Sequence, residues 1–142
     1  MTEKVLLVDD EEAFVETLAE RMRHRGMEVA TSTSGEDALE LIDKEPYDVV
    51  VLDLQMPGMD GLEALARIKR RQPDVQVVLL TGHATVNKGV EAMKRGAMEF
   101  LEKPVDLATL QEIIHKAKAE KLILVERDTE ERIREILQGK SW

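Results

Sequence analysis

The sequence predicts an α/β protein built on an open, doubly wound sheet of five parallel strands. Five short apolar runs alternate with amphipathic segments along the chain, which is the order expected when helices connect parallel strands. Three of the runs are almost continuously apolar, as strands buried on both faces require. The mixed second and fifth runs are therefore expected at the sheet edges. The predicted strands are residues 5–8, 27–31, 49–52, 75–80 and 98–101.

The segments between the strands have the ends that helices need. Ser34 opens one of them as a capping box, with Asp37 in the place that glutamate usually takes. Gly26 and Gly96 lie where helical segments should stop, and each is followed by a predicted strand. The helices therefore fit the intervals between the strands.

The composition excludes several classes of protein. A chain of 142 residues fits one domain. With 20 Lys+Arg against 29 Asp+Glu, the net charge of −9 is poorly suited to binding nucleic-acid phosphates. The absence of cysteine excludes disulfides, thiolate metal sites and cysteine nucleophiles. The start lacks a signal-peptide pattern and no apolar run approaches a membrane span, so a cytoplasmic protein with no membrane contact is expected.

The residues just past the strand ends carry a second pattern. They are Asp9 and Asp10 after the first strand, Asp53 after the third, Thr81 at the end of the fourth and Lys103 after the fifth. The carboxyl ends of parallel strands lie at one edge of a sheet, which is where ligands bind in open α/β folds. We therefore expect these five side chains to converge.

Three carboxylates at one place repel each other unless a cation or a proton offsets their charge. Oxygen ligands of this kind suit Mg²⁺, which binds one or two carboxylates and accepts phosphate oxygens. Lysine and threonine nearby would add a positive charge and a hydrogen-bond donor for a phosphoryl group. Each position alone has a simpler explanation: Asp10 could be a helix cap, Thr81 a turn residue and Lys103 a surface charge. Their joint occurrence favours a site.

These residues and their order resemble the receiver domains of response regulators, the partners of histidine kinases in two-component signalling. The resemblance covers residues 3–118 and is carried by VDDE at 8–11, LDLQMPGMDG at 52–61, LTGHA at 80–84 and GAMEFLEKP at 96–104. It implies a flavodoxin-like sheet with strand order 2-1-3-4-5, five helices and a cytoplasmic, bacterial-type phosphoprotein.

The resemblance also implies the roles of the site residues. Asp53 is the phosphoacceptor that takes its phosphoryl group from a phosphohistidine on a histidine kinase or a phosphotransfer protein. Asp10, Asp53 and the backbone carbonyl of Gln55 bind Mg²⁺ directly, and Asp9 contributes through water. The domain is expected to be no enzyme, with at most a weak autophosphatase activity.

Three further residues have implied roles around the phosphoryl group. Lys103 pairs with the acceptor carboxylate and then with a phosphoryl oxygen, and Thr81 bonds another. The Lys103–Pro104 peptide is expected to be cis. Switching would couple Thr81 to Phe100 and change the surface of the fourth helix and fifth strand for a downstream protein target. The alternative is that Phe100 is a fixed core aromatic. His83 is expected at the rim of the pocket as a solvated loop residue, and the alternative is that it tunes dephosphorylation or contacts a partner.

The last helix is predicted over residues 105–138, about 50 Å at ~1.5 Å per residue. We therefore divide the chain into a receiver domain, residues 1–118, and a helical extension, residues 119–142. A proximal stripe is expected to pack on the sheet: Leu107, Leu110, Ile114 and Ala117. A distal stripe has no core to cover: Leu122, Val125, Thr129, Ile133 and Ile136. It is expected to pair with a second copy or a partner. The alternatives are that it folds back or frays, or is the stub of a longer protein.

Two other functions fit part of the pattern. An aspartyl-phosphate phosphohydrolase would need a second carboxylate two residues after the nucleophile, where this chain has Gln55. A scaffold that is never phosphorylated would usually lack one of the acidic pair, the acceptor or the lysine. A nucleotide-binding P-loop motif is absent. Because residues after 118 leave no room for a helix-turn-helix, output through protein contacts, without direct nucleic-acid binding, is expected.

Overall fold

The computed structural model describes residues 2–82 and 86–139 and has the predicted architecture. One sheet of five parallel strands has the order β2-β1-β3-β4-β5, so the two mixed segments are the edge strands. The strands are β1 Lys4–Val8, β2 Glu28–Ser32, β3 Val49–Leu52, β4 Gln76–Thr81 and β5 Glu99–Glu102. The predicted α/β class and strand order are thereby confirmed.

The strand bounds differ from the predicted ones by one residue at several ends. β2 begins after Met27 because the backbone N–H of Met27 donates to Met22 O and completes the preceding helix end. β4 begins after Val75 because the N–H of Val75 donates to Gln72 O in the preceding turn. Apolar side chains at these positions extend the hydrophobic pattern beyond the hydrogen-bonded strand.

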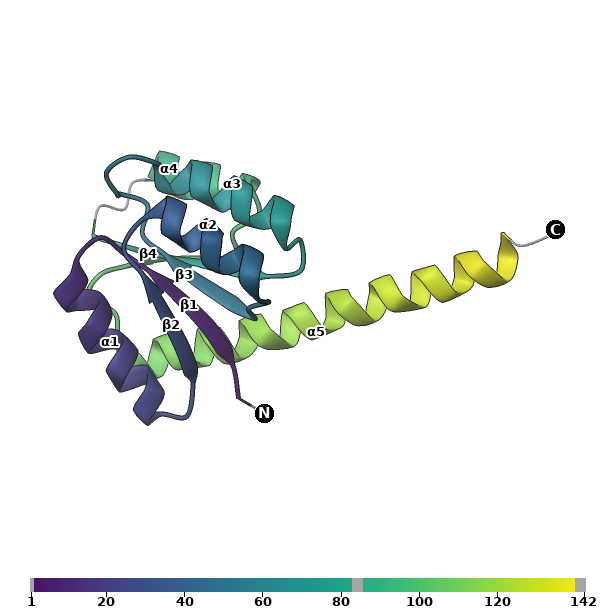
Figure 1. The fold of residues 1–142 in the computed structure, drawn as a ribbon, viewed down its shortest axis with the longest axis horizontal. Helices are drawn as coiled ribbons and strands as arrows, with labels where there is room; N and C mark the ends of the chain where they lie inside the picture. Colours follow the sequence, from purple (N-terminus) through teal and green to yellow (C-terminus); the bar gives the residue numbers. More distant parts are fainter. Residues whose placement is uncertain (1, 83–85, 140–142) are drawn as a thin grey trace.

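Five helices cover the two faces of the sheet (Figure 1). They are α1 Glu12–His24, α2 Gly35–Lys44, α3 Gly61–Arg71, α4 Val86–Lys94 and α5 Leu107–Gln138. Alternate strand residues supply two cores. Leu6 and Val8 pack with α2, α3 and α4, whereas Val5 and Leu7 pack with α1 and α5. The three inner strands, β1, β3 and β4, are buried on both faces, which explains their continuous apolar sequences.

The predicted helix ends are confirmed. The side chain of Ser34 accepts a hydrogen bond from the backbone N–H of Asp37 at 3.1 Å, which caps α2. Gly26 and Gly96 follow α1 and α4 with φ of 88° and 102°, a region that glycine adopts without steric cost. Both helices therefore stop where the sequence indicated.

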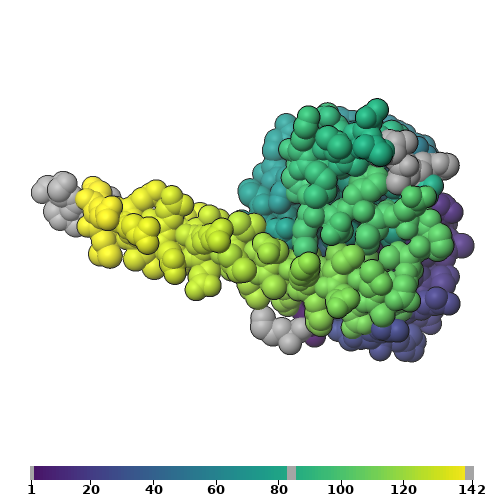
Figure 2. All heavy atoms as spheres, turned by 180° about the vertical axis from the view of Figure 1, so that it is seen from behind, coloured from purple at the N-terminus to yellow at the C-terminus, as the bar shows by residue number. Residues whose placement is uncertain are grey.

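Helix α5 has a packed half and a projecting half (Figures 1 and 2). Leu110, Ile114 and Ala117 are fully buried, and Leu107 packs against the same core at its margin. Past Ala117, no described residue of α5 is buried. Within the described ranges no helix, α5 included, is long and apolar enough to cross a membrane. The distal half is thus an arm that leaves the domain.

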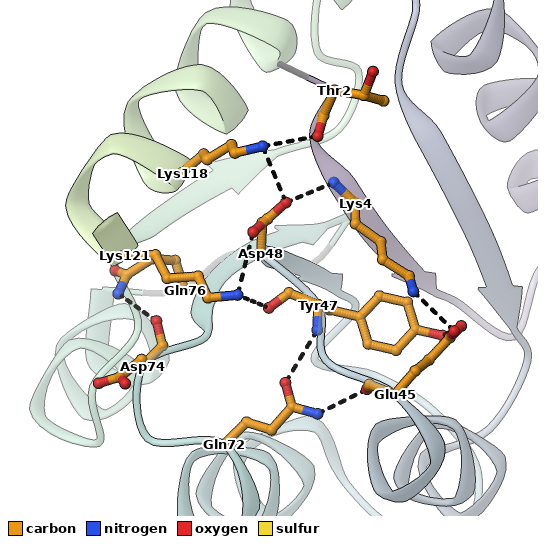
Figure 3. A network of polar contacts seen from close by, with 10 residues as sticks. All are labelled: Thr2, Lys4, Glu45, Tyr47, Asp48, Gln72, Asp74, Gln76, Lys118 and Lys121. Atoms are coloured by element: carbon orange, nitrogen blue, oxygen red, sulfur yellow. Dashed lines mark hydrogen bonds and ion pairs between the residues drawn. The ribbon is translucent and has the colours of Figure 1, made fainter. Parts of the chain in front are cut away.

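A network of hydrogen bonds and ion pairs joins the start of this arm to the amino ends of β1 and β3 (Figure 3). Asp48 accepts a hydrogen bond from the backbone N–H of Lys4 at 2.8 Å and forms ion pairs with Lys121 at 3.2 Å and Lys118 at 3.6 Å. Lys121 also donates to Tyr47 O and Lys118 to Thr2 O. The first turn of α5 beyond the core is therefore held by side chains.

The charge of Asp48 contributes to stability through this network. Burial would raise the pKa of the Asp48 carboxyl, but the bond from Lys4 and the charges of Lys121 and Lys118 together hold it below its ordinary value. Because the folded-state pKa lies below the unfolded-state one, the contribution is present above the ordinary carboxyl pKa. It is lost as the pH falls through the folded value.

Candidate functional site

The carboxylates predicted to converge meet at the carboxyl ends of β1 and β3. In the parallel register Val8 lies opposite Leu52, so the next residues, Asp9 and Asp53, leave the sheet side by side. One carboxylate oxygen each from Asp9, Asp10 and Asp53 lie within 4.8 Å of one another. Such an oxygen-rich group of three fits a hard divalent cation.

The environments of the three carboxylates differ. Asp9 and Asp53 are buried, whereas Asp10 is exposed. One oxygen of each buried carboxylate accepts a backbone N–H two residues further on: Asp9 Oδ1 from Glu11 at 2.9 Å and Asp53 Oδ1 from Gln55 at 3.1 Å. Asp10 is not a helix cap, because the cap position of α1 is Glu11. These bonds fix the two buried side chains and leave their second oxygens for other partners.

Lys103 supplies the positive charge among these carboxylates. Its Nζ lies 2.6 Å from Asp9 Oδ2, 3.3 Å from Glu11 Oε1 and 3.7 Å from Asp53 Oδ2. The ring centroid of Phe14 is 4.2 Å away. The short hydrogen bond thus goes to Asp9, and the acceptor candidate Asp53 is an ion-pair neighbour.

Burial and neighbouring charges shift the pKa of two groups in this cluster. At Asp9, burial outweighs the bond from Lys103 and raises the pKa of the carboxyl above its ordinary value. At Lys103, burial alone would lower the pKa of the ammonium, but the Asp9 bond and the charges of Asp9 and Asp53 raise it. Both groups hold their protons more tightly than usual, Asp9 because it is buried and Lys103 because carboxylates lie beside it.

Thr81 and Lys103 come from the ends of neighbouring strands. Thr81 is fully buried as the last residue of β4. Its carbonyl accepts the backbone N–H of Lys103 at 2.8 Å, which joins the segment after β5 to β4. The Lys103–Pro104 peptide is cis, as expected. All five predicted residues therefore belong to the same end of the sheet.

The loop after Asp53 packs against a glycine whose role was not foreseen. A Cβ on Gly61 would lie 2.4 Å from Leu54 Cα and 2.7 Å from Asp53 O. Its N–H donates to Leu54 O at 3.0 Å. The start of α3 thus touches the backbone that carries Asp53. The sequence showed this glycine only as part of a motif.

Phe100 lies apart from the carboxylates, in a groove between α4 and β5. It is half-buried and packs against the margin of the core, with its ring atoms 3.8 Å from where a Cβ on Gly89 would be. Val86, Val90 and Met93 line the same groove and are exposed. Phe100 therefore bounds an apolar surface rather than sitting in a closed core. His83 lies outside the described residues.

Phe14 and Glu11 were not expected as neighbours of Lys103. Glu11 was part of the quoted segment, and Phe14 follows it by one helical turn. In the sequence, Phe14 has the position of an ordinary apolar residue of α1 that faces the core, and nothing indicates a contact with Lys103. Only the fold brings the two side chains to a lysine more than 85 positions away, as the separation of 92 residues between Glu11 and Lys103 shows.

The comparisons with known proteins identify the family of this chain. The sequence matches the response regulator receiver domain family over residues 5–115. The response regulator protein FleR of Pseudomonas aeruginosa is 38% identical over 114 residues, which are 80% of this chain and 24% of that protein. Several further relatives are named transcriptional regulatory proteins. The chain spans about a quarter of the length of these relatives.

Solved structures show the same fold. A response regulator receiver domain protein from Clostridium thermocellum has a TM-score of 0.81 and 34% identity, covering 86% of this chain and 98% of that one. A response regulator protein from Burkholderia pseudomallei, solved with a phosphorylated aspartic acid, a calcium ion and citrate, has a TM-score of 0.77 and 30% identity. That match covers 90% of this chain and 74% of the other.

By fold, by the position of its acidic cluster and by sequence, the chain is a receiver module of two-component signalling. It belongs to the response regulator receiver domain family.

Proposed function

We propose that Asp53 is the phosphoacceptor and that it takes a phosphoryl group from a phosphohistidine on a sensor histidine kinase or a phosphotransfer protein. A carboxylate oxygen of Asp53 attacks phosphorus, the P–N bond breaks, and the imidazole leaves with the electron pair. The observation that supports this most is the placing of Asp53 among two carboxylates and one ammonium, with oxygens of the three carboxylates within 4.8 Å. Phosphoryl transfer depends on such positioning and charge balance.

The residues around Asp53 fit a bound Mg²⁺. Asp10 and Asp53 would bind it directly with the backbone carbonyl of Gln55, and Asp9 would contribute through water. When bound, the ion offsets the repulsion between the carboxylates and the incoming phosphoryl group. Carboxylate and carbonyl oxygens are the donors that this ion prefers. The Burkholderia relative was solved with a phosphorylated aspartic acid and a calcium ion, which supports the proposal of a phosphoacceptor aspartate and a divalent cation in this chain.

Two side chains of the chain itself would stabilise the transferred group. Lys103, 3.7 Å from Asp53 Oδ2, can bond a phosphoryl oxygen after a small movement. The hydroxyl of Thr81, at the end of the neighbouring strand, can donate to another. No second carboxylate follows Asp53 at the position of Gln55 to activate water, so slow self-hydrolysis is proposed and a phosphohydrolase is not.

Incubation of the chain with acetyl phosphate and Mg²⁺, followed by intact-mass measurement, tests the proposal. We expect one phosphoryl adduct on the parent protein and none on the Asp53→Ala variant, because the variant lacks the nucleophile. No adduct should form on the parent when a chelator removes Mg²⁺ before acetyl phosphate is added. A parent without an adduct would favour a scaffold that is never phosphorylated. Many rapid turnovers of a phosphate ester would favour a hydrolase.

The proposed switch links Thr81 to the groove around Phe100. Movement of Thr81 toward a phosphoryl group would leave room for the Phe100 ring to turn inward, and the apolar surface of α4 and β5 would change for a downstream protein target. The half-buried position of Phe100 beside Gly89 supports two ring positions. With a net charge of −9, we propose that these 142 residues make no direct contact with nucleic acid.

We further propose that residues 1–118 form the receiver unit and residues 119–142 an extension that pairs with a second copy. Leu122, Val125, Ile133 and Ile136 are 48%, 40%, 53% and 57% exposed in one protomer. Their spacing places them on one side of the α5 arm. Two such stripes packed about a twofold axis would bury each other. Residues 126–132 are all charged except Thr129, which places charges beside the stripe and weakens the pairing, so a weak dimer is proposed.

Light scattering at micromolar concentration tests the pairing. The parent is expected to have a mean mass above that of one protomer, rising toward two as its concentration increases, and the Ile133→Arg variant the mass of one, because a charge would enter the apolar seam. Glu131→Arg, on the opposite side of the helix, is the matched control and should leave the mass unchanged. A parent with the mass of one protomer would contradict the pairing without affecting the phosphoacceptor proposal.

A further inference from the structure

The ammonium group of Lys103 lies toward the metal-binding side of the pocket. Its bond to Asp9 Oδ2 is 2.6 Å long, whereas Asp53 Oδ2 is 3.7 Å away, beyond hydrogen-bond distance. Asp9 is also one of the three carboxylates that fit a divalent cation. Lysine and cation therefore use the same carboxylate.

Phe14 makes this position of Lys103 more favourable. Its ring centroid is 4.2 Å from Nζ, well inside the range of a cation–π contact, and Lys103 is only 14% exposed. Partial desolvation strengthens such a contact. Glu11 lies 3.3 Å from the same ammonium, but at 67% exposure its pairing is screened by water. The ring of Phe14 and the carboxylate of Asp9 thus hold Lys103 between them.

We propose that Phe14 is a positioning residue that keeps Lys103 on Asp9 and thereby opposes metal binding. Oδ1 of Asp9 already accepts the backbone N–H of Glu11, so Lys103 must leave Oδ2 and the ring before that oxygen can accept a hydrogen bond from a water on the cation. The ammonium then has Asp53 as its nearest remaining buried carboxylate, where an incoming phosphoryl group needs it. This inference rests on the proposed Mg²⁺-dependent phosphoacceptor function and adds an order of events to it: metal binding releases the lysine for the acceptor.

The test compares Mg²⁺ dissociation constants, measured by calorimetry, for the parent and two variants. Phe14→Leu keeps an apolar side chain but removes the ring, so Lys103 leaves Asp9 more easily. We expect it to bind Mg²⁺ about threefold to tenfold more tightly than the parent. Phe14→Tyr keeps a ring that attracts cations and should bind as the parent does. Leu18→Ala, one turn further along α1, controls for loosening of the helix. Its Mg²⁺ dissociation constant should equal that of the parent.

Nuclear magnetic resonance of Lys103 provides a second measurement that needs no phosphorylation. Its ε-methylene protons should show a ring-current shift in the parent and in Phe14→Tyr but not in Phe14→Leu. Addition of Mg²⁺ to the parent should remove most of this shift as the ammonium moves away. The position of Lys103 would thereby be observed directly.

The outcomes separate this inference from the function on which it rests. A parent that binds Mg²⁺, together with a Phe14→Leu variant of equal or weaker affinity, would overturn the role of Phe14 alone. A ring-current shift that persists at saturating Mg²⁺ would show that Lys103 stays beside Phe14 when the metal is bound, and it would also overturn the role of Phe14. A parent that binds no Mg²⁺ would overturn both the inference and the proposed metal-dependent phosphorylation.

Discussion

The Lys103→Met variant is expected to be phosphorylated by acetyl phosphate about 100-fold more slowly than the parent. Removal of one preorganised donor from a developing negative charge typically lowers a rate by roughly 10²–10³. Lys103 is the cation that the structure places within 4.0 Å of both buried carboxylates, Asp9 and Asp53. Methionine has a similar unbranched length, so the change removes the charge and leaves most of the packing.

The rate is measured from the growth of the phosphoryl adduct by intact mass at saturating Mg²⁺. Lys94→Met, which removes an exposed lysine at the end of α4, is the matched control and should react at the parent's rate. Thermal unfolding of both variants separates a loss of structure from a loss of chemistry. If Lys103→Met reacted as fast as the parent, the lysine would have no part in positioning the phosphoryl group.

The Gly61→Ala variant is expected to lower the free energy of unfolding by about 2–3 kcal/mol, as overpacking of a close contact does. The new Cβ would lie 2.4 Å from Leu54 Cα, and a backbone atom cannot turn aside as a side-chain end can. The acceptor loop must shift, so phosphorylation of Asp53 should slow as well. One methyl group added at the start of α3 is thus expected to change the rate of phosphorylation at Asp53.

Urea unfolding measures the stability change. Gly82→Ala is the control, because a Cβ there would meet no atom of the described residues within 4 Å and its φ is not in the left-handed region. That substitution should leave stability close to the parent's or raise it slightly, since alanine restricts the unfolded chain. Equal unfolding free energies for Gly61→Ala and the parent would show that the loop yields without cost.

Much of this fold could be predicted because its signals are local. Continuous apolar strands, a capping serine at Ser34 and glycines at Gly26 and Gly96 each act over a few residues. The convergence of Asp9, Asp53 and Lys103 followed from one topological rule, that parallel strands end at the same edge. The predicted starts of β2 and β4 were one residue too early. Met27 and Val75 are apolar like the strand residues, but their backbone N–H groups bond to the preceding helix end or turn.

Contacts between distant segments could not be predicted. The ring of Phe14 beside Lys103, the approach of Gly61 to Leu54 and the pairing of Asp48 with α5 depend on how packed elements meet. No periodic pattern and no fixed spacing of residues in the sequence indicates any of these contacts. The same holds for the bond of Lys103 to Asp9, since the strand order brings both carboxylates within its reach and does not choose between them.

The most direct test of Asp53 as the acceptor is to identify which residue carries the phosphoryl group in the phosphorylated protein. Borohydride reduces an acyl phosphate to an alcohol, and peptide mass spectrometry then identifies the altered residue. We predict that the only altered aspartate is Asp53, in the peptide that contains the segment after β3. A reduced residue at Asp9 or Asp10, or a phosphoryl group on a side chain outside the cluster, would contradict the assignment.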